Sequence, residues 1–395
     1  MINHWFEPIF PYNLIYDLGL YCTVLLVFFW FYSVKIISRD HLLLFSTLML
    51  TPFLFNGFLF DWTFLPDQSK YLGIANEARN HMYNSILGYE NEKLPTNSLK
   101  IKAASFFYAL SPILSFDTFK SIAIWNRALF LFMIIFFIRK KQFNRNLILV
   151  LILSPSLIFF SSVSLRDNLI IIIMLMIIYS FFKKKNFLLI ICTVFLALIK
   201  IQNIVILAFF LILNLLTKIQ KKNYKLFSLV ITVSIVLIVL FFANFNQVNF
   251  INILFETVNE IRYGFFSEEY GSYKGLKIRD IYSNFSLGKD YASLKLILYG
   301  FINFITSPLS KINSFFYLVI FVESIALYGI FFYIFSKNFI KFKYISIVWL
   351  CTLTFSLFMY SLVIINDAQI HRYKIPVMFF VIFGYSSHLK KKNES

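Results

Sequence analysis

The chain has 395 residues, of which 59% are hydrophobic, 20% aromatic and only 14% charged, and its mean hydropathy is +0.75. Because soluble globular domains carry about 25% charged residues, this composition excludes an ordinary soluble domain and indicates a polytopic membrane protein. A formal net charge of +18 would suggest a nucleic-acid partner in a soluble chain, so the position of the charges decides what they mean.

Long apolar runs divide the chain into helices. A helix needs roughly 20 apolar residues to cross the hydrocarbon of a bilayer, and on that measure the sequence predicts an all-α protein with about eleven transmembrane helices. The predicted spans are 13–34, 42–60, 120–138, 146–163, 168–182, 187–200, 203–217, 226–243, 315–335, 344–365 and 373–388. Two shorter apolar stretches, 104–116 and 294–308, each contain a Ser-Pro pair and are typical of interfacial or re-entrant segments.

These elements predict a single transmembrane domain over residues 1–395. Two long outer loops, 61–119 and 244–314, are expected to carry short amphipathic or re-entrant helices. The N-terminal residues show neither a basic region nor a small-residue cleavage site before the first span, so we expect no cleavable signal peptide.

The short loops between the spans carry most of the positive charge. The loops 35–41, 139–145, 183–186, 218–225 and 336–343 and the tail from 389 together hold nineteen basic and two acidic residues. The positive-inside rule places them in the cytoplasm, with the N-terminus outside, the C-terminus inside and both long loops outside. These segments account for +17 of the net charge of +18. The charge is therefore a topology signal, and no nucleic-acid partner is predicted.

Four groups of ionisable residues fall at the outer ends of the predicted spans, where charged groups are costly and mark candidate functional sites. The first group contains Asp61 and Asp67. The spacing of Asp67, Tyr71 and Ala75 predicts a helix that begins near Asp67. An aspartate at that place could cap the helix or act as a catalytic base.

The second and third groups lie near the predicted spans 168–182 and 187–200. Arg166 and Asp167 form a charged turn, which could be a structural ion pair or part of a site. Lys200 and Gln202 follow the second of these spans, where a lysine could extend to the interface or bind an anion.

The fourth group, just before the last predicted span, contains His371, Arg372, Tyr373 and Lys374. Basic residues on the outer side oppose the positive-inside trend, so we expect an anionic partner there. Arginine suits a phosphate because its planar guanidinium can donate two parallel hydrogen bonds.

Together the four groups supply a carboxylate and several cations, a set that fits transfer from an anionic lipid carrier. The carboxylate would take the proton of an acceptor hydroxyl, and Arg and Lys would stabilise the departing phosphate. The five histidines form no cluster with metal-ligand spacing, and the three cysteines show no CxxC spacing. No metal ligands are therefore predicted, although a divalent cation stays open as a cofactor.

Several short motifs occur in a fixed order. Asp67-Gln68, Tyr71 and Ala75 are followed by the segment 106–112 and by Asn126-Arg127. Next come Ser154-Pro155, Arg166-Asp167 and Lys200, and the last motif consists of Arg372, Tyr373 and Pro376.

This order resembles that of GT-C type membrane glycosyltransferases, especially the protein mannosyltransferase and aminoarabinose transferase relatives that use polyprenyl-phosphate sugars. The first motif is similar to the acidic first-loop motif of the family, with Gln68 in place of its second acid. Lys200 stands at the Thr-Lys position of the family, with Ile199 in place of the threonine. The resemblance covers roughly residues 60–215 and 366–388.

The resemblance implies an inverting sugar transfer with Asp67 as the base and Asp61 as the reserve base. The substrate and phosphate-binding residues predicted are Arg166, Asp167, Lys200, Gln202, His371, Arg372, Tyr373 and Lys374. The expected partners are an undecaprenyl-phosphate-linked or undecaprenyl-pyrophosphate-linked sugar donor, a glycan or lipid acceptor, and membrane lipids. A composition rich in Phe, Ile, Asn and Lys, typical of an AT-rich genome, predicts the inner membrane of a bacterium.

Two other functions stay open. An O-antigen or capsular polysaccharide repeat-unit polymerase would also have about eleven spans and outward arginines, and the tyrosines of the second outer loop could stack on sugars. A lipid-linked glycan flippase or a transporter would use buried charges, for which Glu323 and Arg127 are the candidates. Transporters often show helices broken by Gly or Pro, and this chain has only 11 Gly and 9 Pro.

Overall fold

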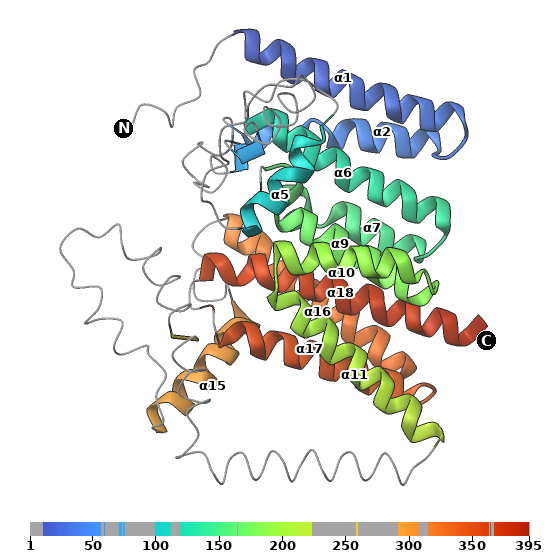
Figure 1. The fold of residues 1–395 in the computed structure, drawn as a ribbon, viewed down its shortest axis with the longest axis vertical. Helices are drawn as coiled ribbons and strands as arrows, with labels where there is room; N and C mark the ends of the chain where they lie inside the picture. Colours follow the sequence, from blue (N-terminus) through green and yellow to red (C-terminus); the bar gives the residue numbers. More distant parts are fainter. Residues whose placement is uncertain are drawn as a thin grey trace, which may run out of the picture. The chain divides into compact units, whose positions relative to one another are not determined.

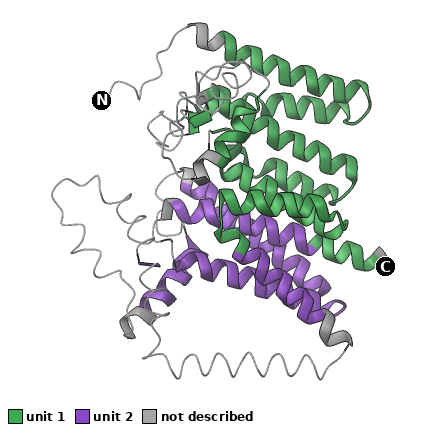
Figure 2. Ribbon diagram, in the orientation of Figure 1, with its two compact units in different colours: residues 1–204, 386–395 green, residues 205–385 purple. Residues whose placement is uncertain are grey.

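The computed structural model describes residues 11–56, 59, 71–72, 74–75, 99–111, 119–163, 165–222, 258–259, 291–307, 315–362, 364 and 367–394. The secondary-structure elements in these ranges are α-helices (Figure 1), which confirms the all-α class. The chain divides into two compact units, Met1–Ile204 with Ser386–Ser395 and Val205–Tyr385 (Figure 2). Each unit is described by itself.

Unit 1 holds the N-terminal helices and the last residues of α18. Its helices are α1 (Pro11–Ser33), α2 (Arg39–Leu48), α3 (Thr51–Phe55), α5 (Leu99–Ala109), α6 (Phe119–Lys140), α7 (Arg145–Leu153), α8 (Pro155–Ser161), α9 (Asp167–Phe182) and α10 (Asn186–Ile199). Unit 2 holds most of α11 (Gln202–Lys222), α15 (Tyr291–Thr306), α16 (Phe315–Phe339), α17 (Lys343–Ser361) and most of α18 (Asp367–Glu394).

Four described helices are long and apolar enough to cross a membrane: Ile15–Ser33, Lys120–Lys140, Tyr317–Phe339 and Lys343–Ser361. Shorter apolar helices are Asp167–Phe182, Asn186–Ile199, Gln202–Thr217 and Lys295–Thr306. The chain therefore has the helices of a membrane protein, while the number of eleven spans stays a prediction. The predicted span 226–243 lies outside the described residues.

Two predicted spans are not single helices, and a proline stands at each break. The predicted span 146–163 consists of α7 and α8, which are separated at Ser154. A proline disfavours the helical conformation of the residue before it, and Ser154 before Pro155 is extended, with φ −59° and ψ 116°. The Ser154 hydroxyl then caps α8 by accepting a hydrogen bond from the Leu157 backbone N–H at 3.2 Å.

The predicted span 42–60 is likewise divided into α2 and α3, with Pro52 in the first turn of α3. Proline has no backbone N–H, so it cannot donate to the carbonyl of Leu48. The Thr51 hydroxyl donates to that carbonyl instead, at 2.7 Å. Neither predicted span is therefore a single helix. At Ser154 the residue before proline leaves the helical conformation, whereas at Pro52 the proline lacks the N–H that would continue the helix.

The last helix begins earlier than the sequence predicts. The basic segment 371–374 was expected to precede a span at 373–388, but α18 starts at Asp367 and runs through this segment with Pro376 inside it. Residues three apart lie on one face of a helix, so His371 and Lys374 share a face. Both side chains are buried, while Arg372 and Tyr373 are half-buried.

The basic segments of unit 1 lie together at one end of the unit. The Lys390 ammonium donates to the carbonyl of Lys141 at 2.6 Å, and the Lys391 ammonium donates to the carbonyl of Phe182 at 3.1 Å. The loop after α1 shares a cavity wall with Ile138 near the end of α6. In Figure 1 the loops that follow α1, α6 and α9 lie at the same end of their helices. Four of the six predicted cytoplasmic segments therefore meet here, and the side of the membrane that they face stays a prediction.

Unit 2 is centred on a fully buried tryptophan. The Trp349 indole stacks on Phe210, with ring centroids 4.4 Å apart, and Phe380 meets it edge-on at 5.8 Å. Gly384 of α18 packs directly against this indole, and a Cβ at that position would overlap the ring. The close approach of α17 and α18 therefore depends on a residue without a side chain.

We expect Gly384→Ala to lower the free energy of unfolding by about 1–3 kcal/mol, because the added methyl group overpacks a core that is already filled. Thermal unfolding of the purified protein in detergent measures the effect. Gly329→Ala is the matched control, since no atom beyond its own stretch of helix lies within 4 Å of a Cβ there and alanine favours helices more than glycine does. Equal melting temperatures of the two variants would contradict the packing role of Gly384.

Candidate functional site

Polar side chains surround the turn between α8 and α9 in unit 1. We call this group the α9 cluster; its members are Thr51, Asn56, Tyr108, Asn126, Arg127, Ser161, Ser162, Asp167 and Asn168. All are buried except Thr51, which is half-buried. In a hydrocarbon environment each polar group needs a partner inside the protein, so the partners of these side chains explain the shape of the turn.

Asn126 of α6 organises the turn. Its amide donates hydrogen bonds to the carbonyls of Phe160, Val163 and Leu165, at 3.1, 2.8 and 3.3 Å. The Asn168 amide donates in turn to the backbone and side-chain oxygens of Asn126, both at 2.9 Å. One carboxamide pair thus ties the middle of α6 to the end of α8 and to the start of α9.

Tyr108 of α5 fastens the same turn from another side. Its hydroxyl donates to the carbonyl of Leu165 at 2.7 Å. Burial raises the pKa of Tyr108, with further raising by Tyr71 and Asp167 against a lowering by Arg166. The phenol therefore stays protonated and continues to donate at neutral pH.

Tyr71, the tyrosine of the first-loop motif, contacts Tyr108 of the α9 cluster. The Tyr71 ring meets the Tyr108 ring edge-on, with centroids 6.1 Å apart. Tyr71 and Ala75 are both buried, and the described residues between them are helical. Asp61 and Asp67, the predicted bases of this loop, lie outside the described residues, so their role stays a prediction.

Arg127 lies one residue beyond Asn126 and is fully buried. Its Nε donates to the Leu48 carbonyl at 3.3 Å, and its Nη1 donates to the Ser161 hydroxyl. The guanidinium also lies over the Phe130 ring, 5.5 Å from its centroid. Within the described part of the chain no carboxylate pairs with Arg127 and its Nη2 has no hydrogen-bond partner. Carbonyl and hydroxyl dipoles therefore balance this charge.

The predicted phosphate-binding residues of unit 1 lie at one end of the unit. Arg166 is the half-buried N-cap of α9, and Asp167 is buried in the first turn, where a negative charge complements the helix dipole. Helices α9 and α10 pack as a hairpin joined at 183–185, so Lys200 at the end of α10 returns to the level of Asp167. Lys200 is buried and Gln202 is half-buried.

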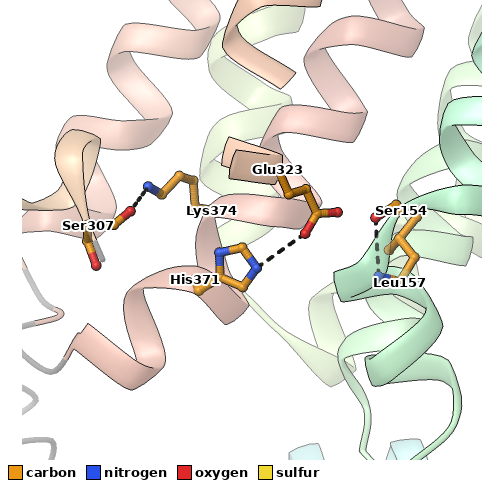
Figure 3. A network of polar contacts seen from close by, with 6 residues as sticks. All are labelled: Ser154, Leu157, Ser307, Glu323, His371 and Lys374. Carbon is orange, nitrogen blue, oxygen red and sulfur yellow. Dashed lines mark hydrogen bonds and ion pairs between the residues drawn. The ribbon is translucent and has the colours of Figure 1, made fainter. Parts of the chain in front are cut away.

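The predicted residues of α18 belong to unit 2 and have different surroundings. The Lys374 ammonium donates to the carbonyls of Ser307 and Ile305, at 2.7 and 3.2 Å, and thus caps the C-terminal end of α15 (Figure 3). The His371 Nε2 lies 3.8 Å from the Glu323 carboxylate (Figure 3). The Tyr373 ring meets the Tyr360 ring edge-on, with centroids 5.2 Å apart.

Glu323 is the residue of unit 2 that sequence reasoning considered only as a buried charge. It lies in α16, an apolar helix that the charge interrupts, and it is buried beside His371. The Tyr328 ring lies 5.9 Å from the Lys374 ammonium, and in the described residues the Tyr328 hydroxyl has no hydrogen-bond partner. Glu323, His371 and Lys374, which are buried, and the half-buried Tyr328 therefore form an ionisable group, which we call the α16–α18 group.

The sequence motifs include Asn126 and the segment 106–112 with Tyr108, but sequence reasoning assigned no role in a site to Tyr108, Asn126 or Asn168. A carboxamide inside an apolar run was the available signal, because burying it without a partner is costly. In the described ranges no three His, Cys, Asp or Glu side chains lie close enough to hold a metal ion.

Comparison of the chain with protein-family models, with curated proteins and with solved structures finds no match in any of the three.

We expect Asn126→Ala to lower the free energy of unfolding by about 1–3 kcal/mol, because it leaves buried carbonyls around the α8–α9 turn without a donor. Chemical or thermal unfolding in detergent measures the loss. Asn338→Ala is the matched control, since the half-buried Asn338 amide donates to a carbonyl of its own helix, that of Ile334. If both alanine variants were equally stable, Asn126 would not organise the turn.

Proposed function

We propose that the protein is a membrane glycosyltransferase that transfers a sugar from a polyprenyl-linked donor to a glycan or lipid acceptor at the outer face of a bacterial inner membrane. One observation supports the proposal above the others. Three segments that resemble glycosyltransferase motifs, around Tyr71, around Tyr108 and at Arg166-Asp167, pack against one another at one end of unit 1. Segments far apart in the sequence that meet at one place are what a substrate site requires.

The chemistry of this end suits a lipid phosphate. Arg166 and Lys200 lie there beside a turn that the α9 cluster holds in place. In the proposed reaction the acceptor hydroxyl gives its proton to Asp67 as its oxygen attacks the anomeric carbon. The bond from that carbon to the phosphate oxygen breaks, and the two cations stabilise the negative charge that grows on the phosphate.

The donor that the protein turns over distinguishes a single-sugar transferase from a polymerase. Purified protein in nanodiscs would be incubated with a polyprenyl-phosphate monosaccharide and, separately, with a pyrophosphate-linked oligosaccharide, and products would be separated by chromatography. Turnover of the monosaccharide donor alone supports the proposal. Turnover of the oligosaccharide alone would assign an O-antigen or capsular repeat-unit polymerase instead.

A second candidate function, a lipid-linked glycan flippase or transporter, is favoured by the α16–α18 group. Buried ionisable residues in membrane helices commonly line substrate or proton pathways, and Glu323 with His371 is such a pair. Movement of a fluorescent lipid-linked glycan across proteoliposomes, without turnover of either donor, would support this function and exclude the transferase.

We expect Asp67→Asn to lower the kcat of sugar transfer about 10²–10⁴-fold, the usual contribution of a general base. Single-turnover assays with saturating donor measure the chemical step. Glu77→Gln, at another acid of the same predicted loop, is the matched control, and we expect its rate to stay close to that of the wild type. Loss of activity in Asp61→Asn alone would transfer the role of base to Asp61.

Arg166→Gln should raise the KM for the donor about tenfold to a hundredfold, as expected for the loss of a hydrogen bond to a charged group. The melting temperature should change little, because Arg166 is half-buried and caps α9 without a side-chain hydrogen bond. The control is Arg139→Gln, since Arg139 is an exposed arginine in the last turn of α6. An unchanged KM in Arg166→Gln would remove this residue from the donor site.

A further inference from the structure

The basic end of unit 1 contains a cavity of about 620 Å³. It lies between the end of α1, the start of α2 and the end of α6, and its wall includes Tyr32, Ser33, Lys35, Ser38, His41 and Ile138. This volume falls within the range of roughly 300–1,000 Å³ that is usual for small-molecule sites. It belongs to neither the α9 cluster nor the α16–α18 group.

One lysine distinguishes the turn at the cavity from the other basic turns at the same end of unit 1. Lys35, Lys141 and Lys184 all follow helix ends with a positive φ, of 59°, 48° and 54°. This left-handed conformation is unfavourable for a residue with a side chain. Of the three, Lys35 alone lines the cavity, and within the described residues it forms no ion pair.

Two contacts between Ser38 and His41 orient the His41 imidazole in the cavity wall. The Ser38 hydroxyl accepts from the His41 backbone N–H at 3.3 Å, and its oxygen lies 2.8 Å from the His41 Nδ1. When the hydroxyl donates to Nδ1, the neutral imidazole carries its proton on Nε2, so that nitrogen becomes a donor. The cavity wall then supplies an ammonium and an N–H group, both of which bind a phosphate oxygen.

Basic residues predominate among the described residues around the cavity. Burial lowers the pKa of His41, and the nearby positive charge of Arg145 lowers it further, against a raising by Asp40. Arg39 is the next residue after Ser38, and both Arg39 and Arg145 are exposed. Cations therefore outnumber the single acid of this place.

The apolar surroundings match a lipid better than a soluble anion. Trp30 and Tyr32, at the end of α1, are 57% and 38% exposed. Exposed Trp and Tyr at helix ends are typical of the membrane interface, where lipid phosphates lie. Basic pockets between membrane helices on the cytoplasmic side commonly bind acidic headgroups.

We propose that this cavity binds the phosphate of an anionic membrane lipid, with Lys35 as the principal cation and His41 as a hydrogen-bond donor. The site is separate from the proposed sugar-donor site and does not depend on the proposed function. Its occupant would join α1, α2 and α6 at the predicted cytoplasmic face.

The test measures lipid binding by the full chain in detergent. Native mass spectrometry would count the lipids retained during titration with phosphatidylglycerol and, separately, with phosphatidylcholine. We expect preference for phosphatidylglycerol, and we expect Lys35→Gln to weaken its binding about fivefold, the effect of one basic residue near a lipid surface. Lys184→Gln, which removes the same charge from a turn of the same conformation, should leave binding within twofold.

Three results would overturn the proposal. Equal weakening by Lys35→Gln and Lys184→Gln would mean that the lipid responds only to the overall charge. Displacement of the lipid by millimolar inorganic phosphate would assign the site to a free anion. Wild-type binding by Lys35→Gln would exclude the cavity as the lipid site. The variant Lys35→Arg keeps the charge, so we expect it to retain binding.

Discussion

The structure of unit 1 depends on where one buried carboxamide places its hydrogen bonds. Asn126 is fully buried in an apolar helix, so its amide and the carbonyls of the α8–α9 turn satisfy one another. This exchange fixes the direction in which α9 starts, and therefore the place of Arg166 and Asp167. Tyr108 adds a second donor to the same turn and joins it to the Tyr71 segment. The proposed donor site thus depends on polar groups that hold the backbone of the α8–α9 turn in place.

The proline at position 52 supplies a free carbonyl to Arg127, the neighbour of Asn126. Pro52 cannot donate to Leu48, and the Leu48 carbonyl accepts from Thr51 and Arg127 instead. A continuous α-helix would have used that carbonyl itself. An arginine can therefore be fully buried here because the neighbouring helix is interrupted at the correct residue.

The sequence predicts the class of the protein better than its site. Composition and apolar runs predict an all-α membrane protein, because hydrocarbon allows few alternatives, and the described secondary-structure elements are helical, with four helices long and apolar enough to cross a membrane. Pro155 and Pro52 could have predicted the breaks at Ser154 and Leu50. Spans assigned from the mean hydropathy of a long apolar run do not detect such breaks. The helical start of α18 at Asp367 was missed because its polar residues lower the hydropathy. The partners of Asn126 lie 34 to 42 positions away, and no local pattern specifies such pairs.

The last residues of α18 determine when unit 1 can be completed during synthesis of the chain. Unit 1 consists of residues up to Ile204 and of Ser386–Ser395, and the latter contribute the ammonium groups that bond Lys141 and Phe182. These groups are made after all of unit 2. The turns after α6 and α9 therefore gain these two hydrogen bonds only once residue 391 has been added to the chain.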